Sequence, residues 1–135
     1  MRRAIQLALS LLSFVASPVA LAAGGVEVFY IGTDDCFYCQ HWEAARRPEL
    51  LAAMRGTTAR LVEIRGESIS KPVTERHYPR QHRWLYAQLG DVRGVPRFVL
   101  AVDGRIILKT QGTSDYSKNF EPAVRAALAK SAKSR

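Results

Sequence analysis

The 135-residue chain contains only two cysteines, and this scarcity limits what sulfur can do in it. Cys36 and Cys39 are separated only by Phe37 and Tyr38. A small exported domain that needs covalent stabilisation usually carries several cysteines, which join distant segments. A bridge between these two would close a loop of four residues and would remove little chain entropy from the unfolded state. A purely structural disulfide is therefore a poor explanation of the pair.

The chain also lacks the features of a nucleic-acid-binding protein. Its formal net charge is +8, but no basic stripe is interleaved with aromatic residues, so we expect no nucleic-acid partner. Several positive charges lie at the C-terminus, where residues 131–135 are expected to form a solvated basic tail. We find no internal repeat, low-complexity segment or interdomain linker. This pattern predicts one domain, spanning residues 23–130.

The one long apolar run lies at the N-terminus. Residues 1–22, MRRAIQLALSLLSFVASPVALA, place two arginines before this run and end in small residues, which predicts a secretory signal peptide cleaved after Ala22. Residues 4–23 are nearly long enough for a retained membrane anchor, although Pro18 weakens that alternative. We expect an exported protein, periplasmic or otherwise, without stable membrane insertion after cleavage. Disulfides can persist in such a compartment.

The rest of the chain alternates predicted strands and helices. Asp103-Gly104, between two apolar runs, is a strong signal for a two-residue β-hairpin. Residues 66–81 are polar and irregular and give little guidance. The order of elements predicts a mixed α/β sheet flanked by helices. In chain order we expect a strand at 26–31, a helix from about Cys36 that breaks near Arg47-Pro48, an edge strand at 59–65, a short helix at 82–89, hairpin strands at 97–102 and 105–110, and a final helix at 115–130.

Three features of the sequence resemble the thioredoxin superfamily when they are taken together. They are Cys36-Phe37-Tyr38-Cys39 at a strand–helix junction, VRGVP at 92–96, and the hairpin that leads to the last helix. The resemblance implies a thioredoxin-like mixed sheet of about four strands in the order 2-1-3-4, trimmed of the strand and helix that usually come first. It also implies that Pro96 is a cis-proline facing the cysteines and that Val95 offers its backbone to a substrate.

The spacing of the two cysteines suits thiol–disulfide exchange. Residues three apart on a helix share a face, and a sulfur at the helix start receives backbone N–H groups that favour its thiolate. Cys36 would attack a partner disulfide, and the more buried Cys39 would resolve the mixed disulfide. This reaction needs an accessible sulfur at Cys36 and no bound cofactor. The expected partners are cysteine-containing exported proteins, contacted by the exposed side chains of Phe37 and Tyr38, and a redox protein that recycles the pair.

The chain departs from the family pattern in two places. Tyr30 stands where thioredoxins often have a buried acid, and Glu27 lies too far back on the same strand to replace that acid. Asp35 stands where a tryptophan commonly precedes the first cysteine. The charges of Asp34 and Asp35 should disfavour a thiolate at Cys36 and so stabilise the disulfide, which favours a reductase or isomerase over a strong oxidant.

Two other functions remain open from the sequence. Cys36, Cys39, His77 and His82 read as C-x2-C followed by H-x4-H, a ligand set that suits zinc or copper, although 37 residues separate the two halves. The chain could also be a binding module that kept the fold without catalysis.

Overall fold

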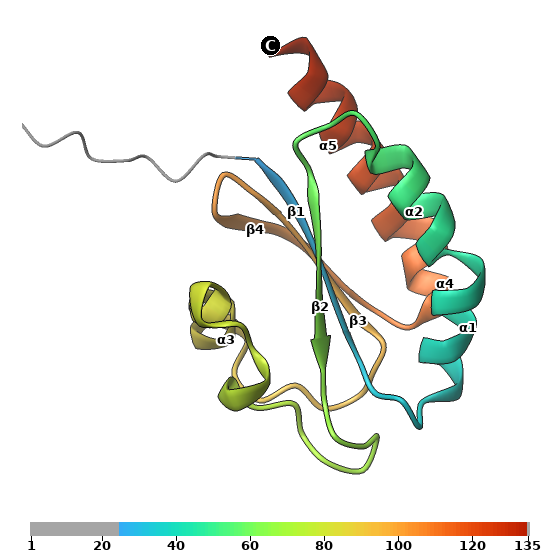
Figure 1. Ribbon diagram of the computed structural model, residues 1–135, viewed down its shortest axis with the longest axis vertical. Helices are drawn as coiled ribbons and strands as arrows, with labels where there is room; N and C mark the ends of the chain where they lie inside the picture. The colour runs from blue at the N-terminus through green and yellow to red at the C-terminus, as the bar shows by residue number, and fades with distance from the viewer. Residues whose placement is uncertain (1–24, 135) are drawn as a thin grey trace, which may run out of the picture.

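The computed structural model describes residues 25–134, which form a four-stranded sheet with helices on both faces (Figure 1). The strand order is β2 (Arg60–Arg65), β1 (Val26–Gly32), β3 (Arg97–Val102) and β4 (Arg105–Gln111). β1 pairs in parallel with β2, while the β1–β3 and β3–β4 pairs are antiparallel. The predicted mixed sheet and its order 2-1-3-4 are confirmed. The predicted signal peptide, residues 1–22, lies outside the described residues.

β1 is a central strand that is buried on both faces. Val28 and Tyr30 belong to a core cluster shared with α1 (Phe37–Ala45), α2 (Arg47–Met54) and α5 (Glu121–Lys133). Phe29 and Ile31 belong to a second cluster, on the face covered by α3 (Arg83–Leu89) (Figure 1). Side chains of a strand alternate between faces, so a strand covered on both sides appears in the sequence as a nearly continuous apolar run.

The predicted helix break and hairpin are both present. Pro48 lies in the first turn of α2, where its missing N–H interrupts no helical hydrogen bond. Asp103 and Gly104 have φ angles of 52° and 74°, the left-handed conformation that a tight hairpin turn requires at both central positions.

The C-terminal helix has three parts. α4 (Thr113–Asp115) leads into a π-helical turn (Tyr116–Phe120) and then into α5, which continues three residues beyond the predicted end at Lys130. Phe120, Val124 and Leu128 are buried on one face of this helix, against the sheet. Within residues 25–134, no helix has the length and apolar character needed to cross a membrane.

The polar segment between β2 and α3 has defined structure. It contains two short 3-10 turns, Glu75–His77 and Arg80–His82. Before them, Val73 pairs with Val92 as an isolated antiparallel bridge. This bridge ties the segment to the residues that precede β3.

Candidate active site

The two cysteines lie where β1 ends and α1 begins. Cys36 is the N-cap residue of α1, and its Sγ accepts a hydrogen bond of 3.1 Å from the backbone N–H of Cys39. The two residues form a disulfide, with their Cα atoms 5.1 Å apart. The structure thus brings the pair together at a helix N-terminus, as the spacing predicts. A backbone donor aimed at Cys36 Sγ would also stabilise a negative charge on that sulfur.

The sulfur of Cys36 is not accessible in this disulfide-bonded form. Both cysteines have 0% of their surface exposed, which differs from the expectation of an open sulfur at Cys36. The carbonyl oxygen of Val95 lies 3.7 Å from Cys36 Sγ, and Val95 packs against the core cluster that contains both cysteines. The turn before β3 therefore covers the disulfide.

The predicted substrate-contacting residues lie beside the disulfide. The Val95-Pro96 peptide bond is cis, as the resemblance implies. Phe37 and Tyr38, in the first turn of α1, expose 73% and 61% of their surface, and their rings meet edge to face. An aromatic pair left in solvent next to a reactive group is typical of a surface that contacts other proteins.

Both aspartates before Cys36 have partners at the end of β2 or in the segment that follows it. The Asp35 carboxylate accepts hydrogen bonds from Ser68 Oγ (2.7 Å) and from the backbone N–H of Ile69 (2.9 Å). The bond from Ser68 is the main reason that the pKa of Asp35 lies below its usual value. Asp34 pairs with Arg65 at 3.3 Å. These donors offset part of the negative charge beside Cys36, so the two aspartates disfavour a Cys36 thiolate less than two unpaired carboxylates would.

A polar network that is partly buried lies on the face of α1 that meets β1. Tyr30 is fully buried, and its hydroxyl donates a 2.6 Å hydrogen bond to Glu43 Oε1, which also accepts one of 2.6 Å from Arg65. Burial, followed by the bond to Glu43, raises the pKa of Tyr30. Burial works to raise the pKa of Glu43, but the bonds from Tyr30 and Arg65 outweigh it and leave that pKa below its usual value.

Sequence reasoning identified Tyr30 in the family's acid position but missed Glu43. The available signal was spacing, because Glu43 follows Cys39 by four residues and so lies on the same face of α1. Glu43 thus supplies a carboxylate one helical turn beyond Cys39. The hydroxyl of Tyr30, on β1, holds this carboxylate in place. Glu27, at the start of β1, plays no part in this network.

The four residues of the metal alternative do not come together. His82 Nε2 lies 2.9 Å from Glu27 Oε2, at the opposite end of β1 from the cysteines. His77 Nδ1 accepts a hydrogen bond from the backbone N–H of Thr74. Across residues 25–134, no three side chains of histidine, cysteine, aspartate or glutamate converge as metal ligands would.

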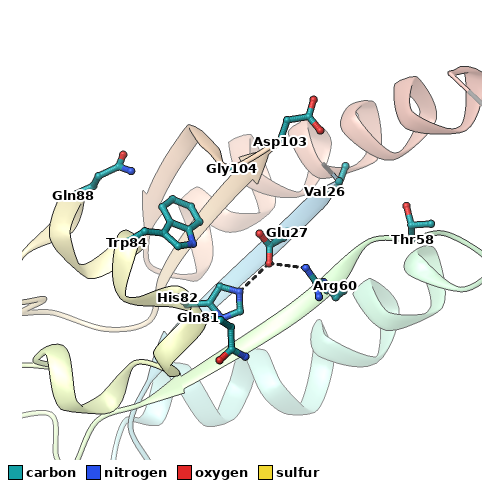
Figure 2. A pocket seen from close by; sticks show the side chains of 11 residues that line it. Val26, Glu27, Thr58, Arg60, Gln81, His82, Trp84, Gln88, Asp103 and Gly104 are labelled. Carbon is teal, nitrogen blue, oxygen red and sulfur yellow. Dashed lines mark hydrogen bonds and ion pairs between the residues drawn. The ribbon is translucent and has the colours of Figure 1, made fainter. Parts of the chain in front are cut away.

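A hollow of about 920 Å³ is also remote from the cysteines (Figure 2). It surrounds Glu27, whose carboxylate bonds to His82 and lies 3.4 Å from Arg60, with Trp84 on one side. Of the candidate residues from the sequence, only His82 of the metal alternative lines it, and neither cysteine does. We therefore place the candidate active site at the disulfide rather than in this hollow.

No family model and no curated protein sequence matches the chain. Solved structures do match it: a point mutant of the thioredoxin of Halobacterium salinarum aligns with a TM-score of 0.50 and 22% identity, over 76% of this chain and 74% of that one. The fold is that of the thioredoxins. Thioredoxin from Aeropyrum pernix aligns with a TM-score of 0.47 and 24% identity, over 73% of each chain. Spinach chloroplast thioredoxin f aligns with a TM-score of 0.48 and 23% identity, over 84% of this chain and 87% of that one. The chain thus combines a thioredoxin-like fold with a Cys-X-X-Cys disulfide at the start of a helix.

Proposed function

We propose that the chain is a thiol–disulfide oxidoreductase of an exported compartment, which exchanges disulfides with cysteine-containing partner proteins. One observation carries the proposal: Cys36 caps the helix that holds Cys39, with the two sulfurs bonded to each other beside the Val95 carbonyl. Exposed Phe37 and Tyr38 and the turn at Val95-Pro96 supply the partner-contacting surface. A redox partner returns the pair to its working state.

The reaction is a pair of sulfur exchanges that needs no bound cofactor. The Cys36 thiolate attacks one sulfur of a partner disulfide, the partner S–S bond breaks, and the leaving thiolate takes a proton from water. The Cys39 thiolate then attacks Cys36 Sγ in the mixed disulfide and releases the second partner sulfur. The partner gains two electrons and two protons, and the Cys36–Cys39 pair loses them. The reverse steps oxidise a partner dithiol.

Burial of Cys36 adds a step to recycling. A thiolate that reduces the disulfide must approach Cys36 Sγ along the S–S axis, and that sulfur has no exposed surface. Because Val95 lies over it, the turn that carries Val95 has to shift when the recycling partner binds. Reduction by a docked protein should therefore be faster than reduction by a small thiol of the same reactivity.

We also propose that the pair works as a reductase or isomerase of its substrates rather than as a strong oxidant. Asp34 and Asp35 keep two carboxylates next to Cys36, although donors from Arg65, Ser68 and Ile69 offset part of their charge. A four-residue loop also gives the disulfide some stability over the free thiols.

The test uses cysteine variants of the full chain. Cys36→Ser should abolish dithiothreitol-driven reduction of insulin, and Cys39→Ser should accumulate a mixed disulfide that survives denaturing gels without reductant. His77→Ala combined with His82→Ala is the control, and it should keep the activity. Activity that persists in Cys36→Ser, or partner affinity that both cysteine variants leave unaltered, would contradict catalysis by this pair.

Export needs its own measurement. The protein isolated from the expressing cell should be found outside the cytoplasm, and N-terminal sequencing should begin at Ala23 if the leader is cleaved as predicted. A cytoplasmic protein that begins at Met1 would contradict it.

A further inference from the structure

Given the proposed function, we infer that residues 66–73, named here the Ile69 loop, contact the substrate together with the Phe37-Tyr38 pair and the turn at Val95-Pro96. In this inference Asp35 is a positioning residue: it holds the loop so that Ile69 contacts an apolar side chain next to the partner's cysteine. The substrate class is then an extended segment of an exported protein in which leucine, isoleucine or valine flanks the reactive cysteine.

The Ile69 loop is held at two points. Near its start, Asp35, the residue before Cys36, binds Ser68 and Ile69. At its end, Val73 and Val92 exchange two backbone hydrogen bonds of 2.9 and 3.0 Å, three residues before Val95. The loop therefore runs from the turn that precedes the first cysteine to the segment that ends in the cis-proline. Figure 1 shows it curving below the end of β2, next to the turn that follows β1.

The Ile69 loop presents an apolar side chain that the fold leaves uncovered. Ile69 exposes 55% of its surface, although its backbone N–H is bound by Asp35. Among the described residues, five large hydrophobic side chains are exposed, and three of them, Phe37, Tyr38 and Ile69, lie on the two segments next to the disulfide. Such clustering of exposed apolar groups at one site is typical of a surface that binds a partner.

The hydrogen bonds of Asp35 explain why this position holds a carboxylate. A carboxylate can accept both the Ser68 hydroxyl and the Ile69 N–H, and such charge-assisted bonds are stronger than neutral ones. A tryptophan, which the family commonly has at this position, could not accept them. Asp34 is adjacent, carries the same charge, exposes 95% of its side chain and pairs with Arg65 instead. Asp34 is therefore a matched control for Asp35.

The experiment compares two synthetic heptapeptides whose central cysteine carries a 2-thiopyridyl disulfide. In one peptide leucine flanks the cysteine, and in the other serine does. Full-length protein is reduced, freed of reductant and mixed with each peptide, and release of 2-thiopyridone is followed by absorbance. The ratio of the two rate constants is the readout, because the intrinsic reactivity of Cys36 cancels in it. We expect the wild type to prefer the leucine peptide about fivefold, as partial burial of one aliphatic side chain implies.

Ile69→Ser and Asp35→Ala should each reduce this ratio to about one, whereas Asp34→Ala should keep it. Equal rates for the two peptides in the wild type would overturn the inference, and so would a preference that survives Ile69→Ser. A preference that survives Asp35→Ala would overturn the positioning role of that residue. Failure of the proposed function has a different signature, since reduced wild-type protein would then leave even 2,2′-dithiodipyridine unreacted.

Discussion

Reduction of the Cys36–Cys39 disulfide should lower the free energy of unfolding by about 1 kcal/mol. The bridge closes a loop of four residues, and the chain-entropy relation gives about 2 kcal/mol for a loop of that length. In the reduced protein a thiolate at Cys36 would keep the hydrogen bond from the Cys39 N–H at the helix N-terminus, which returns about 1 kcal/mol. The oxidised form should therefore remain the more stable one.

This difference also reports the direction of electron flow. Stability and reduction potential belong to one thermodynamic cycle, so 1 kcal/mol of extra stability in the oxidised form makes the folded disulfide harder to reduce by about 20 mV than the unfolded one. The assay is urea unfolding of the full chain at pH 7, with and without dithiothreitol. Equal denaturant slopes in both series would confirm that the same surface is exposed.

A reduced form that is more stable than the oxidised form would refute this reasoning. Strong oxidants of the disulfide-exchange class owe their potential to a stabilised reduced form. That result would mean that the N–H groups around Cys36 stabilise its thiolate by more than loop closure stabilises the bridge. It would reverse the proposed direction without affecting the exchange chemistry.

Two further predictions concern buried tyrosines. Tyr30→Phe should cost about 2 kcal/mol at pH 7, because Glu43 loses a charge-assisted hydrogen bond. The folded state lowers the pKa of Glu43, so this cost should shrink as the pH falls below the usual 4.5, and a cost that stays constant in urea unfolding at pH 3 would contradict the pairing. Burial raises the pKa of Tyr78 and of Tyr116 to about 12. Each tyrosine leaves the free energy of unfolding unchanged below pH 10.0, the usual tyrosine pKa, and lowers it by about 1.4 kcal/mol per pH unit above that value, because the unfolded state loses its proton first. Tyr116→Phe should therefore make the free energy of unfolding fall less steeply between pH 10 and 11.

Local patterns were sufficient to predict most of the fold. The apolar run of β1, Pro48 at the start of α2 and Asp103-Gly104 in the hairpin each act through neighbouring backbone geometry. The sheet order, by contrast, was implied by the resemblance to the thioredoxin superfamily, and the structure has that order. The cysteine pair was equally readable, because its spacing on a helix decides whether the two sulfurs can meet.

The surroundings of the cysteines were less readable because they depend on contacts between distant segments. Asp35 meets Ser68 across 33 residues, and Tyr30 meets Glu43 across 13. Neither contact leaves a periodic pattern in the sequence. The burial of Cys36 in the disulfide-bonded form was not readable for the same reason, since Val95, which lies against its sulfur, is 59 residues away.

The sheet order nevertheless explains why these distant segments converge on the disulfide. β1 and β2 are parallel, so the turn before Cys36 and the Ile69 loop both leave the sheet at the same edge. β3 is antiparallel to β1 and begins beside Ile31, so the turn that carries Val95 arrives at that edge as well. The topology thus brings three segments together at the disulfide. The reactivity of the sulfurs and the selectivity for substrates can therefore depend on different segments. The cysteine pair performs the exchange, while Ile69 and Val95 lie on segments that can change without altering the helix that holds the sulfurs.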